Sequence, residues 1–265
     1  MDKSRCILQR ERIHPGILRL TLNDESRRNA LSHAMLAEIS AALTNVETDE
    51  KVRVIVIAAN GSAFCAGHDL KEITAARSNE DGGRSEYEGL FSACASLMQS
   101  IVASSKPVIA EVAGVATAAG CQLVASCDLA VAADTARFAT PGVNIGLFCS
   151  TPMVALSRNV AHKHAMEMLL TGDMISATSA QQIGLVNRVL SSEDLTAGTM
   201  ALAERIAQKS SITLAMGKKA FYAQSSMPLA GAYEYTSAVM VDNILKYDAE
   251  EGIRAFVEKR HPKWQ

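Results

Sequence analysis

The stretch Phe64-Cys65-Ala66-Gly67-His68-Asp69-Leu70-Lys71 decides the fold, together with a second small-residue stretch, Ala118-Ala119-Gly120-Cys121-Gln122-Leu123. Each follows an apolar run that predicts a buried strand, over 52–59 for the first and over 108–115 for the second. Each is followed by a helical pattern. A tight turn between a strand and a helix leaves backbone N–H groups free to bind an anion. Two such turns side by side can direct two N–H groups at one oxygen, which predicts an oxyanion hole for a carbonyl that becomes an enolate.

The neighbouring segments predict alternating strands and helices. Alternation of apolar and polar residues over 17–22 predicts a strand, and apolar residues at three- and four-residue spacing over 35–46 predict an amphipathic helix. Asp69 opens a short helix, and we expect the polar segment 78–85 after it to be mobile. A further helix is predicted over 90–101. This mixture of elements predicts an α/β fold.

From residue 191 onward the pattern is helical throughout. Helices are predicted at about 191–208, 212–223, 230–247 and 248–260. The change in pattern divides the chain into a strand-and-helix core over residues 1–190 and a C-terminal helical region over residues 191–265.

The composition excludes several classes of protein. The chain has 265 residues, of which 48% are hydrophobic and 20% charged, as expected for one sizeable globular domain. A net charge of −2 does not favour a broad nucleic-acid-binding face. The longest apolar stretches are interrupted by polar residues, so no membrane span is expected.

The cysteines and the first residues bear on redox state and location. The six cysteines show no spacing typical of a zinc site, so no metal is expected, and we interpret them as reduced core thiols. Residues 1–10 contain no hydrophobic segment typical of a secretory signal. We therefore expect a cytoplasmic protein.

The two quoted stretches and several others resemble, in order and spacing, the enoyl-CoA hydratase/isomerase (crotonase) superfamily. The further segments that carry the resemblance are Asn29–Leu31, Lys106–Ala110, Cys127–Asp128, Leu170–Gly172 and Phe256–Arg260. Segments 117–122 and 140–144 resemble one branch of the family most closely. The resemblance implies a spiral of ββα repeats, a C-terminal helical trimerisation region, and a homotrimer or a dimer of trimers.

The resemblance also implies an acyl-CoA or enoyl-CoA thioester as substrate, with coenzyme A as part of that substrate and no permanently bound cofactor. It places the oxyanion hole on the backbone N–H groups of Ala66 and Ala119. The alternative for each turn alone is that its small residues only allow a turn to pack closely on a strand. Each donor of an oxyanion hole contributes roughly 2.7–4 kcal/mol to the transition state.

The family implies a set of contacts to coenzyme A. Its adenine and ribose-phosphate would lie along the first turn, on backbone groups of Ala66, His68, Asp69 and Leu70. The cations and the C-terminal residues implied to contact it are Arg27, Lys71, Phe256 and Lys259, the last two often from a neighbouring subunit. Arg27 and Lys71 can equally be ordinary surface cations, and Phe256 can equally be a core residue.

The acid and base of family hydratases are missing from their expected positions. Such hydratases use two glutamates around a water molecule. Here one position is Gln122 and the other is Gly142, and a third position, where dehalogenase-like members have aspartate, falls near Ser150. Glutamine can hydrogen-bond a thioester or a water but does not titrate, so Gln122 is a candidate for positioning only.

Three groups could replace the missing carboxylates. The first is an acidic side chain from the polar segment: Glu80, Asp81, Glu86 or Glu88. The second is His68, which titrates near neutral pH and has packing beside coenzyme A as its other interpretation. The third is 149–151, whose thiol and hydroxyl groups can instead cap a helix.

The sequence thus predicts an acyl-CoA-binding protein of the hydratase/isomerase class that stabilises a thioester enolate, although Gln122 and Gly142 stand where hydratases have glutamate. It leaves two alternatives open. One is a catalytically silent acyl-CoA-binding or partner subunit. The other is a reaction that needs no carboxylate pair, such as decarboxylation or thioester hydrolysis.

Overall fold

The structure is a computed structural model that describes residues 6–14 and 16–265. Its strands are β1 (Leu8–His14), β2 (Gly16–Leu22), β3 (Val52–Ala59), β4 (Ala63–Cys65), β5 (Val108–Val112), β6 (Val115–Thr117), β7 (Leu129–Ala133), β8 (Arg137–Ala139), β9 (Ile175–Ser176) and β10 (Arg188–Leu190). Its α-helices are α1 (His33–Glu47), α2 (Leu70–Ala76), α3 (Arg84–Ala103), α4 (Ala119–Ser126), α5 (Pro152–Asn159), α6 (His162–Thr171), α7 (Ala177–Gln182), α8 (Leu195–Ala207), α9 (Ser211–Gln224), α10 (Leu229–Ile244) and α11 (Tyr247–Val257).

The strands form two sheets, and from β3 to β8 successive strands alternate between them. One sheet has the order β1-β2-β3-β5-β7-β10 and the other β4-β6-β8-β9. The consecutive pairs β3/β4, β5/β6 and β7/β8 each place one strand in each sheet, and like strands of successive pairs are parallel. This repeated advance is the spiral of ββα units expected from the sequence, so the predicted α/β fold class is confirmed.

The prediction of a single strand over 108–115 is wrong, because the chain bends between β5 and β6. Gly114 lies at the bend, where a Cβ atom would come within 2.3 Å of the Ser62 carbonyl oxygen. Only glycine lets the two backbones approach this closely. The bend sends the chain from one sheet to the other, and a run of apolar residues alone does not reveal it.

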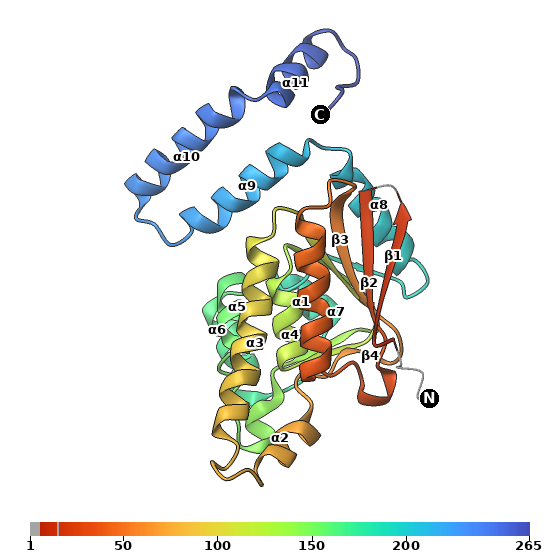
Figure 1. Cartoon of the computed structure of the whole chain (residues 1–265), viewed down its shortest axis with the longest axis vertical. Helices are drawn as coiled ribbons and strands as arrows, with labels where there is room; N and C mark the ends of the chain where they lie inside the picture. Colours follow the sequence, from red (N-terminus) through yellow and green to blue (C-terminus); the bar gives the residue numbers. More distant parts are fainter. Residues whose placement is uncertain (1–5, 15) are drawn as a thin grey trace.

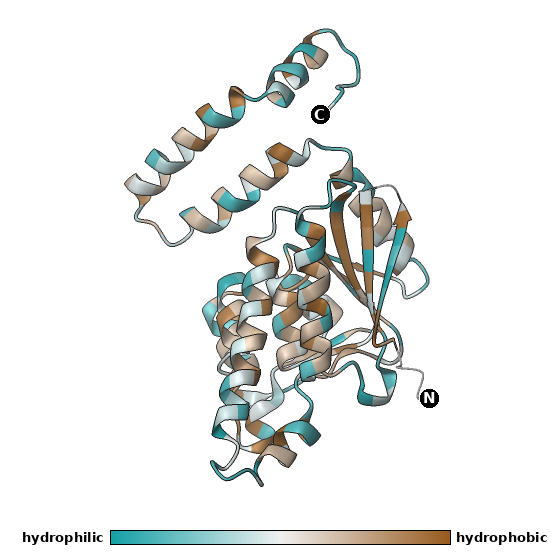
Figure 2. Cartoon of the chain, in the orientation of Figure 1, coloured by the Kyte–Doolittle hydropathy of each residue, from teal (hydrophilic) through white to brown (hydrophobic). Residues whose placement is uncertain are grey.

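Helices cover the sheets and enclose the core. Helices α1, α3, α4 and α5 pack in sequence against one another, and α8 packs against β2, β3, β5 and β7. Figure 1 shows α1 and α3 side by side along the length of the core. The strands β2 and β3 are largely hydrophobic (Figure 2), and the largest fully buried side chains include Phe64, Phe138 and Ile57. Helix α8 lies after residue 190, where the sequence predicts the boundary between the core and the C-terminal helical region. That boundary stays a prediction.

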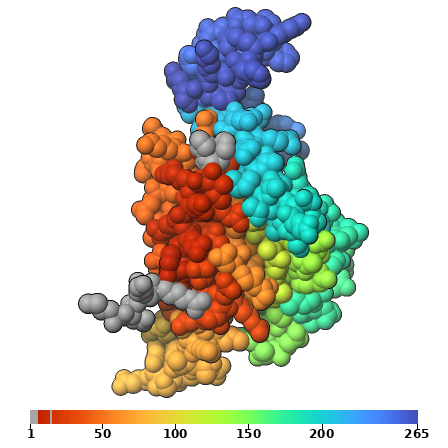
Figure 3. All heavy atoms as spheres, turned by 90° about the vertical axis from the view of Figure 1, so that its right-hand side faces the viewer, coloured from red at the N-terminus to blue at the C-terminus, as the bar shows by residue number. Residues whose placement is uncertain are grey.

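The C-terminal helices α9, α10 and α11 extend away from the core, as Figures 1 and 3 show. Lys218 of α9 connects these helices to the core, because its Nζ donates to the Asp128 carboxylate at 2.7 Å and to the Ile101 carbonyl at 2.9 Å. Tyr222 donates to the same carboxylate at 2.9 Å. The predicted C-terminal helices are present, and the bounds of the individual helices are close to those expected.

Two elements differ from the sequence-based expectation. Helix α3 begins at Arg84, ahead of the predicted start at residue 90, because Asp81 accepts hydrogen bonds from the backbone N–H groups of Gly83 and Ser85 at 2.9 and 2.8 Å. The strand β1 was not predicted, because its run of charged residues hides the alternation of a strand at the sheet edge. In the part of the chain that the structure describes, no helix is long and apolar enough to cross a membrane.

Candidate functional site

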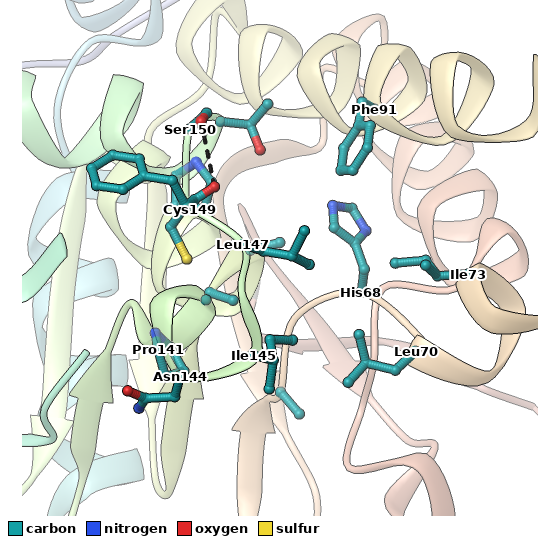
Figure 4. A pocket seen from close by; sticks show the side chains of 17 residues that line it. His68, Leu70, Ile73, Phe91, Pro141, Asn144, Ile145, Leu147, Cys149 and Ser150 are labelled. Carbon is teal, nitrogen blue, oxygen red and sulfur yellow. Dashed lines mark hydrogen bonds between the residues drawn. The ribbon is translucent and has the colours of Figure 1, made fainter. Parts of the chain in front are cut away.

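A cavity of about 630 Å³ lies where the two small-residue turns meet the loop before α5. Ala66, His68, Ala118 and Ala119 line it from the turns. Most of the remaining wall is apolar, and the side chains shown in Figure 4 include Leu70, Ile73, Phe91, Pro141, Ile145 and Leu147. The turns quoted from the sequence therefore belong to one pocket.

Two glycines allow the turns to touch. A Cβ atom on Gly120 would lie 2.1 Å from the Cys65 carbonyl oxygen, so α4 can start against β4 only if residue 120 has no side chain. Gly67 has φ +91°, and a Cβ atom there would lie 3.0 Å from Cβ of Ala118 and 3.3 Å from the Ala119 nitrogen. The backbones of the two turns are in direct contact as a result.

The second turn contains a strained residue. Ala118 precedes the first residue of α4 and has φ +51° and ψ −120°, a conformation that is unfavourable for any residue with a Cβ atom. Its N–H donates to the Ala139 carbonyl at 3.0 Å, which helps to hold it in place. The N–H of Ala119 has no acceptor within the helix, because Ala119 is the first residue of α4.

The backbone donors of the two turns differ from those predicted. The N–H of Ala66 donates to the Arg28 carbonyl at 3.1 Å, so the assignment of Ala66 as an oxyanion donor is wrong. The N–H groups of His68 and Ala119 have no acceptor in the part of the chain that the structure describes. His68 forms an isolated parallel bridge with Leu31, in which the Leu31 N–H donates to the Gly67 carbonyl at 2.7 Å and the His68 N–H takes no part.

The imidazole of His68 lies in the pocket wall. Its Nδ1 is 3.3 Å from the Leu31 carbonyl oxygen, and Nε2 is buried without a partner among the described residues. The ring meets that of Phe91 edge to face, with centroids 5.4 Å apart, and Figure 4 shows the two side chains pointing toward each other. Burial lowers the pKa of His68, the Leu31 hydrogen bond opposes this, and the nearby His33 lowers the pKa further.

Gln122 and Gly142 are positioned differently from each other. Gln122 is buried on α4 and is not part of the pocket wall, since its Oε1 lies 4.0 Å from the Cys94 thiol of α3. Gly142 does line the pocket, but a Cβ atom there would lie 2.5 Å from the Leu147 carbonyl oxygen. The backbone of Leu147 occupies the space where a side chain at position 142 would begin.

Comparison with known proteins identifies the family. The family model described as enoyl-CoA hydratase/isomerase matches residues 12–265.

The chain belongs to the enoyl-CoA hydratase/isomerase family.

Within this family, the chain is 48% identical over 258 residues to enoyl-CoA hydratase domain-containing protein 3, mitochondrial, of Xenopus laevis, covering 97% of this chain and 85% of that one. The protein of the same name from Homo sapiens is 47% identical over 94% of this chain and 80% of its own length. A crystal structure of an enoyl-CoA hydratase of Mycobacterium smegmatis is 49% identical, with a TM-score of 0.93 and coverage of 97% of this chain and 98% of that one. The two relatives named enoyl-CoA hydratase domain-containing protein 3 confirm the prediction, made from segments 117–122 and 140–144, that the chain is most similar to one branch of the family.

The prediction of a cytoplasmic location is contradicted by these relatives. Those from Xenopus laevis, Mus musculus and Homo sapiens are all named mitochondrial. The prediction rested on the lack of a hydrophobic segment in residues 1–10, of which 1–5 lie outside the described residues. Such a lack does not distinguish the cytoplasm from a mitochondrion, because mitochondrial targeting uses amphipathic rather than hydrophobic sequences.

The acidic side chains just before α3 and near its start do not line the pocket, so they do not supply the carboxylates that family hydratases use. Glu80, Asp81, Glu86 and Glu88 are absent from the pocket wall. Hydrogen bonds from the Ser85 hydroxyl and from backbone N–H groups hold the pKa of Asp81 at about 2. Glu86 lies 2.7 Å from His33, and Glu88 lies 3.3 Å from Arg84. Asp81, Glu86 and Glu88 thus have structural partners outside the pocket.

The segment before α5 lines the pocket but does not cap that helix with its side chains. Thr151 is the N-cap residue of α5, yet its side chain makes no capping hydrogen bond, so the capping interpretation was wrong. Ser150 donates to the Phe148 carbonyl at 3.4 Å. Burial raises the pKa of the Cys149 thiol, which keeps it protonated at neutral pH.

Only some of the residues that the family implies for coenzyme A lie at the first turn. Asp69 caps α2 by accepting from the Lys71 N–H at 2.8 Å, and its other oxygen is 3.1 Å from Arg27. Arg27 also lies 3.4 Å from Glu72, so its charge is already opposed by carboxylates. Leu70 and Lys71 are exposed beside the pocket, and Leu70 lines it.

Phe256 and Lys259 are not brought to the pocket within one chain. Phe256 is 85% exposed on α11, which rules out the core interpretation. Lys259 follows α11 with φ +56°. Helix α11 lies at one end of the molecule and α2, beside the pocket, at the other (Figure 1). Any contact of these two residues with a ligand in such a pocket requires a second subunit.

Proposed function

We propose that this chain binds acyl-CoA or enoyl-CoA thioesters and holds the thioester carbonyl oxygen between the N–H groups of His68 and Ala119. The observation that carries the proposal is that these two N–H groups lack acceptors while both residues line one pocket. Donors without a competing acceptor, fixed by a rigid backbone, stabilise the negative charge that develops on an enolate oxygen. Contact between Gly67 and the second turn provides that rigidity.

The pocket wall suits the acyl part of such a ligand. Its side chains are mainly aliphatic and aromatic, and no Asp, Glu, Lys or Arg among the described residues lines it. An apolar acyl chain gains roughly 0.8 kcal/mol for each CH₂ group that it buries. Several relatives are named enoyl-CoA hydratase, which supports the same class of ligand.

The proposed reaction class is enolate stabilisation without the usual hydration step. Gln122 cannot titrate, and Gly142 bears no side chain. Loss of one general acid or base typically lowers a rate by 10²–10⁴-fold. We therefore expect hydration of an enoyl-CoA far below the rate of a hydratase that has both glutamates.

A catalytically silent acyl-CoA-binding or partner subunit is the second candidate. The orientation of Gln122 toward Cys94 favours it, because the side chain is then outside the pocket. Closure of the Leu147 backbone over Gly142 favours it as well. Both observations concern proton transfer and leave ligand binding intact.

Coenzyme A would lie along the first turn, beside Leu70 and Lys71, with Phe256 and Lys259 supplied by a neighbouring subunit of a homotrimer or a dimer of trimers. The exposed apolar side chains of α9 to α11 support self-association, since a face of this kind is usually covered. They include Phe221, Leu229, Tyr233, Met240, Leu245, Phe256 and Val257.

Calorimetry with butyryl-CoA and with coenzyme A alone tests the proposal. We expect butyryl-CoA to bind more tightly than coenzyme A, because the acyl chain enters the apolar pocket. Infrared spectroscopy of butyryl-CoA labelled with ¹³C at the carbonyl should show a lowered C=O stretching frequency in the complex, as two hydrogen bonds weaken that bond. The absence of binding, or an unshifted carbonyl band, would overturn the proposal.

A hydration assay with crotonyl-CoA separates the expected activity from that of an ordinary hydratase. We expect a rate at least about 100-fold below that of a family member with both glutamates. Rapid hydration by the pure protein would contradict the proposed lack of an acid/base pair. Restoring both glutamates is not a usable test, because Glu at position 142 collides with the Leu147 backbone.

A further inference from the structure

The pocket contains one side chain that can act as a base at neutral pH. Among the described residues that line it, His68 and Cys149 carry titratable side chains. The thiol of Cys149 is protonated because burial raises its pKa. Burial of His68 lowers its pKa, so that the imidazole is neutral and able to accept a proton.

Hydrogen bonding fixes which nitrogen of His68 is free. A carbonyl oxygen only accepts, so the Nδ1 atom, 3.3 Å from the Leu31 oxygen, carries the proton of the neutral ring. The lone pair therefore lies on Nε2. That atom is buried and has no partner within residues 6–14 and 16–265, a costly state for a polar atom that a ligand can relieve.

Covalent structure keeps the imidazole close to the proposed oxyanion hole. One donor for the carbonyl oxygen is the backbone N–H of His68 itself, so the thioester would be bound beside the ring of the same residue. The α carbon is only one bond beyond the carbonyl carbon. Phe91 packs against the ring and is 40% exposed, and access of a thioester to the buried Nε2 requires this side chain to turn aside.

We propose that Nε2 of His68 takes a proton from the α carbon of a thioester whose carbonyl oxygen is bound by the N–H groups of His68 and Ala119. This step rests on the proposed function. The C–H bond breaks and its proton forms the Nε2–H bond of an imidazolium. The C–H electron pair forms the C=C bond of an enolate, and the π pair of the C=O bond moves to the oxygen. The reverse step returns a proton to carbon. In D₂O the imidazolium exchanges with solvent, and deuterium replaces the α protons without any further reactant.

Proton exchange at the α carbon of butyryl-CoA in D₂O, followed by NMR, tests this inference. We expect the wild-type protein to catalyse loss of the α-CH₂ signal. His68→Gln keeps the backbone N–H but cannot take up a proton, so exchange should fall at least 100-fold, while the Kd of butyryl-CoA measured by calorimetry changes by less than about threefold. His164→Gln, the same change at an exposed histidine of α6, is the matched control and should exchange at the wild-type rate.

A second variant, His68→Phe, keeps the ring packed near Phe91 and should also lose exchange, which protects the test if His68→Gln folds poorly. If the wild type binds butyryl-CoA without exchanging its α protons, the inference is wrong and the proposed function stands. If either His68 variant exchanges at the wild-type rate, the inference is likewise wrong. If butyryl-CoA does not bind at all, the proposed function fails and this step fails with it.

Discussion

The turn from β4 to α2 and the turn from β6 to α4 are in contact, but the glycine of each turn has a different structural role. In the first turn, Gly67 adopts φ +91°, a conformation that favours glycine. In the second turn, the residue with positive φ is Ala118, at +51°, and the glycine follows two positions later. Gly120 is needed because the Cys65 carbonyl occupies the space of its Cβ atom.

The same two turns also differ in the chemistry of their side chains. The first places the titratable imidazole of His68 in the pocket wall. The second directs Gln122 toward Cys94, away from that wall. Similar strand-turn-helix patterns thus place a titratable side chain in the pocket wall at the first turn and none at the second. Substitutions at these positions measure how far the difference extends.

Gly120→Ala should have the largest effect. Its Cβ atom would lie 2.1 Å from a backbone oxygen that cannot move without shifting β4. We expect the free energy of unfolding to fall by more than about 3 kcal/mol, measured by denaturant titration. Gly217→Ala is the matched control, since nothing lies within 4 Å of that position in α9, and it should stabilise by about 0.5–1 kcal/mol. Equal effects at the two sites would contradict the steric role of Gly120.

Gly67→Ala should come next, with a loss of about 1–3 kcal/mol, because alanine is strained at φ +91° and its Cβ atom would lie 3.0 Å from that of Ala118. Combining it with Ala118→Gly removes the second methyl group. The double variant should therefore be more stable than the sum of the single changes predicts, as measured in a double-mutant cycle. Strict additivity would show that a Cβ atom at position 67 does not clash with the Ala118 methyl group.

Ala118→Gly alone should stabilise the protein by about 1 kcal/mol, because relief of the strain at φ +51° exceeds the entropy that glycine loses on folding. The melting temperature should rise by about 2–4 °C. A fall would show that the turn is held by contacts of the Ala118 methyl group rather than under strain.

The smallest expected effect is a dependence of stability on pH that arises from the first turn only. The pKa of His68 is lowered on folding, so below about pH 6.5 the unfolded chain binds a proton that the folded chain does not. Stability should fall as the pH drops from that value toward the folded pKa and then level off. His68→Gln should flatten this part of the profile, whereas Gln122→Asn, in the second turn, should leave its slope unchanged. Denaturant titrations from pH 5 to 8 measure both slopes.

Much of the fold follows from local pattern. The strands β2 and β3, the helix α1 and the C-terminal helices lie close to where periodicity predicts them, because each buries apolar side chains. The bend at Gly114 and the edge strand β1 escaped prediction for opposite reasons. An unbroken apolar run conceals the bend, and charged residues conceal the strand.

For the site, the sequence by itself determined that two small-residue turns would follow buried strands, and it has Gln122 and Gly142 where the family resemblance predicts glutamates. These properties depend on residue type and spacing along the chain. The tertiary structure decided which N–H groups are free, since the Ala66 N–H is taken by the Arg28 carbonyl from a distant segment. It also decided that Gln122 points to Cys94 and that the Leu147 backbone closes over Gly142. Hydrogen-bond partners and occupied space depend on segments far apart in sequence, so packing alone assigns them.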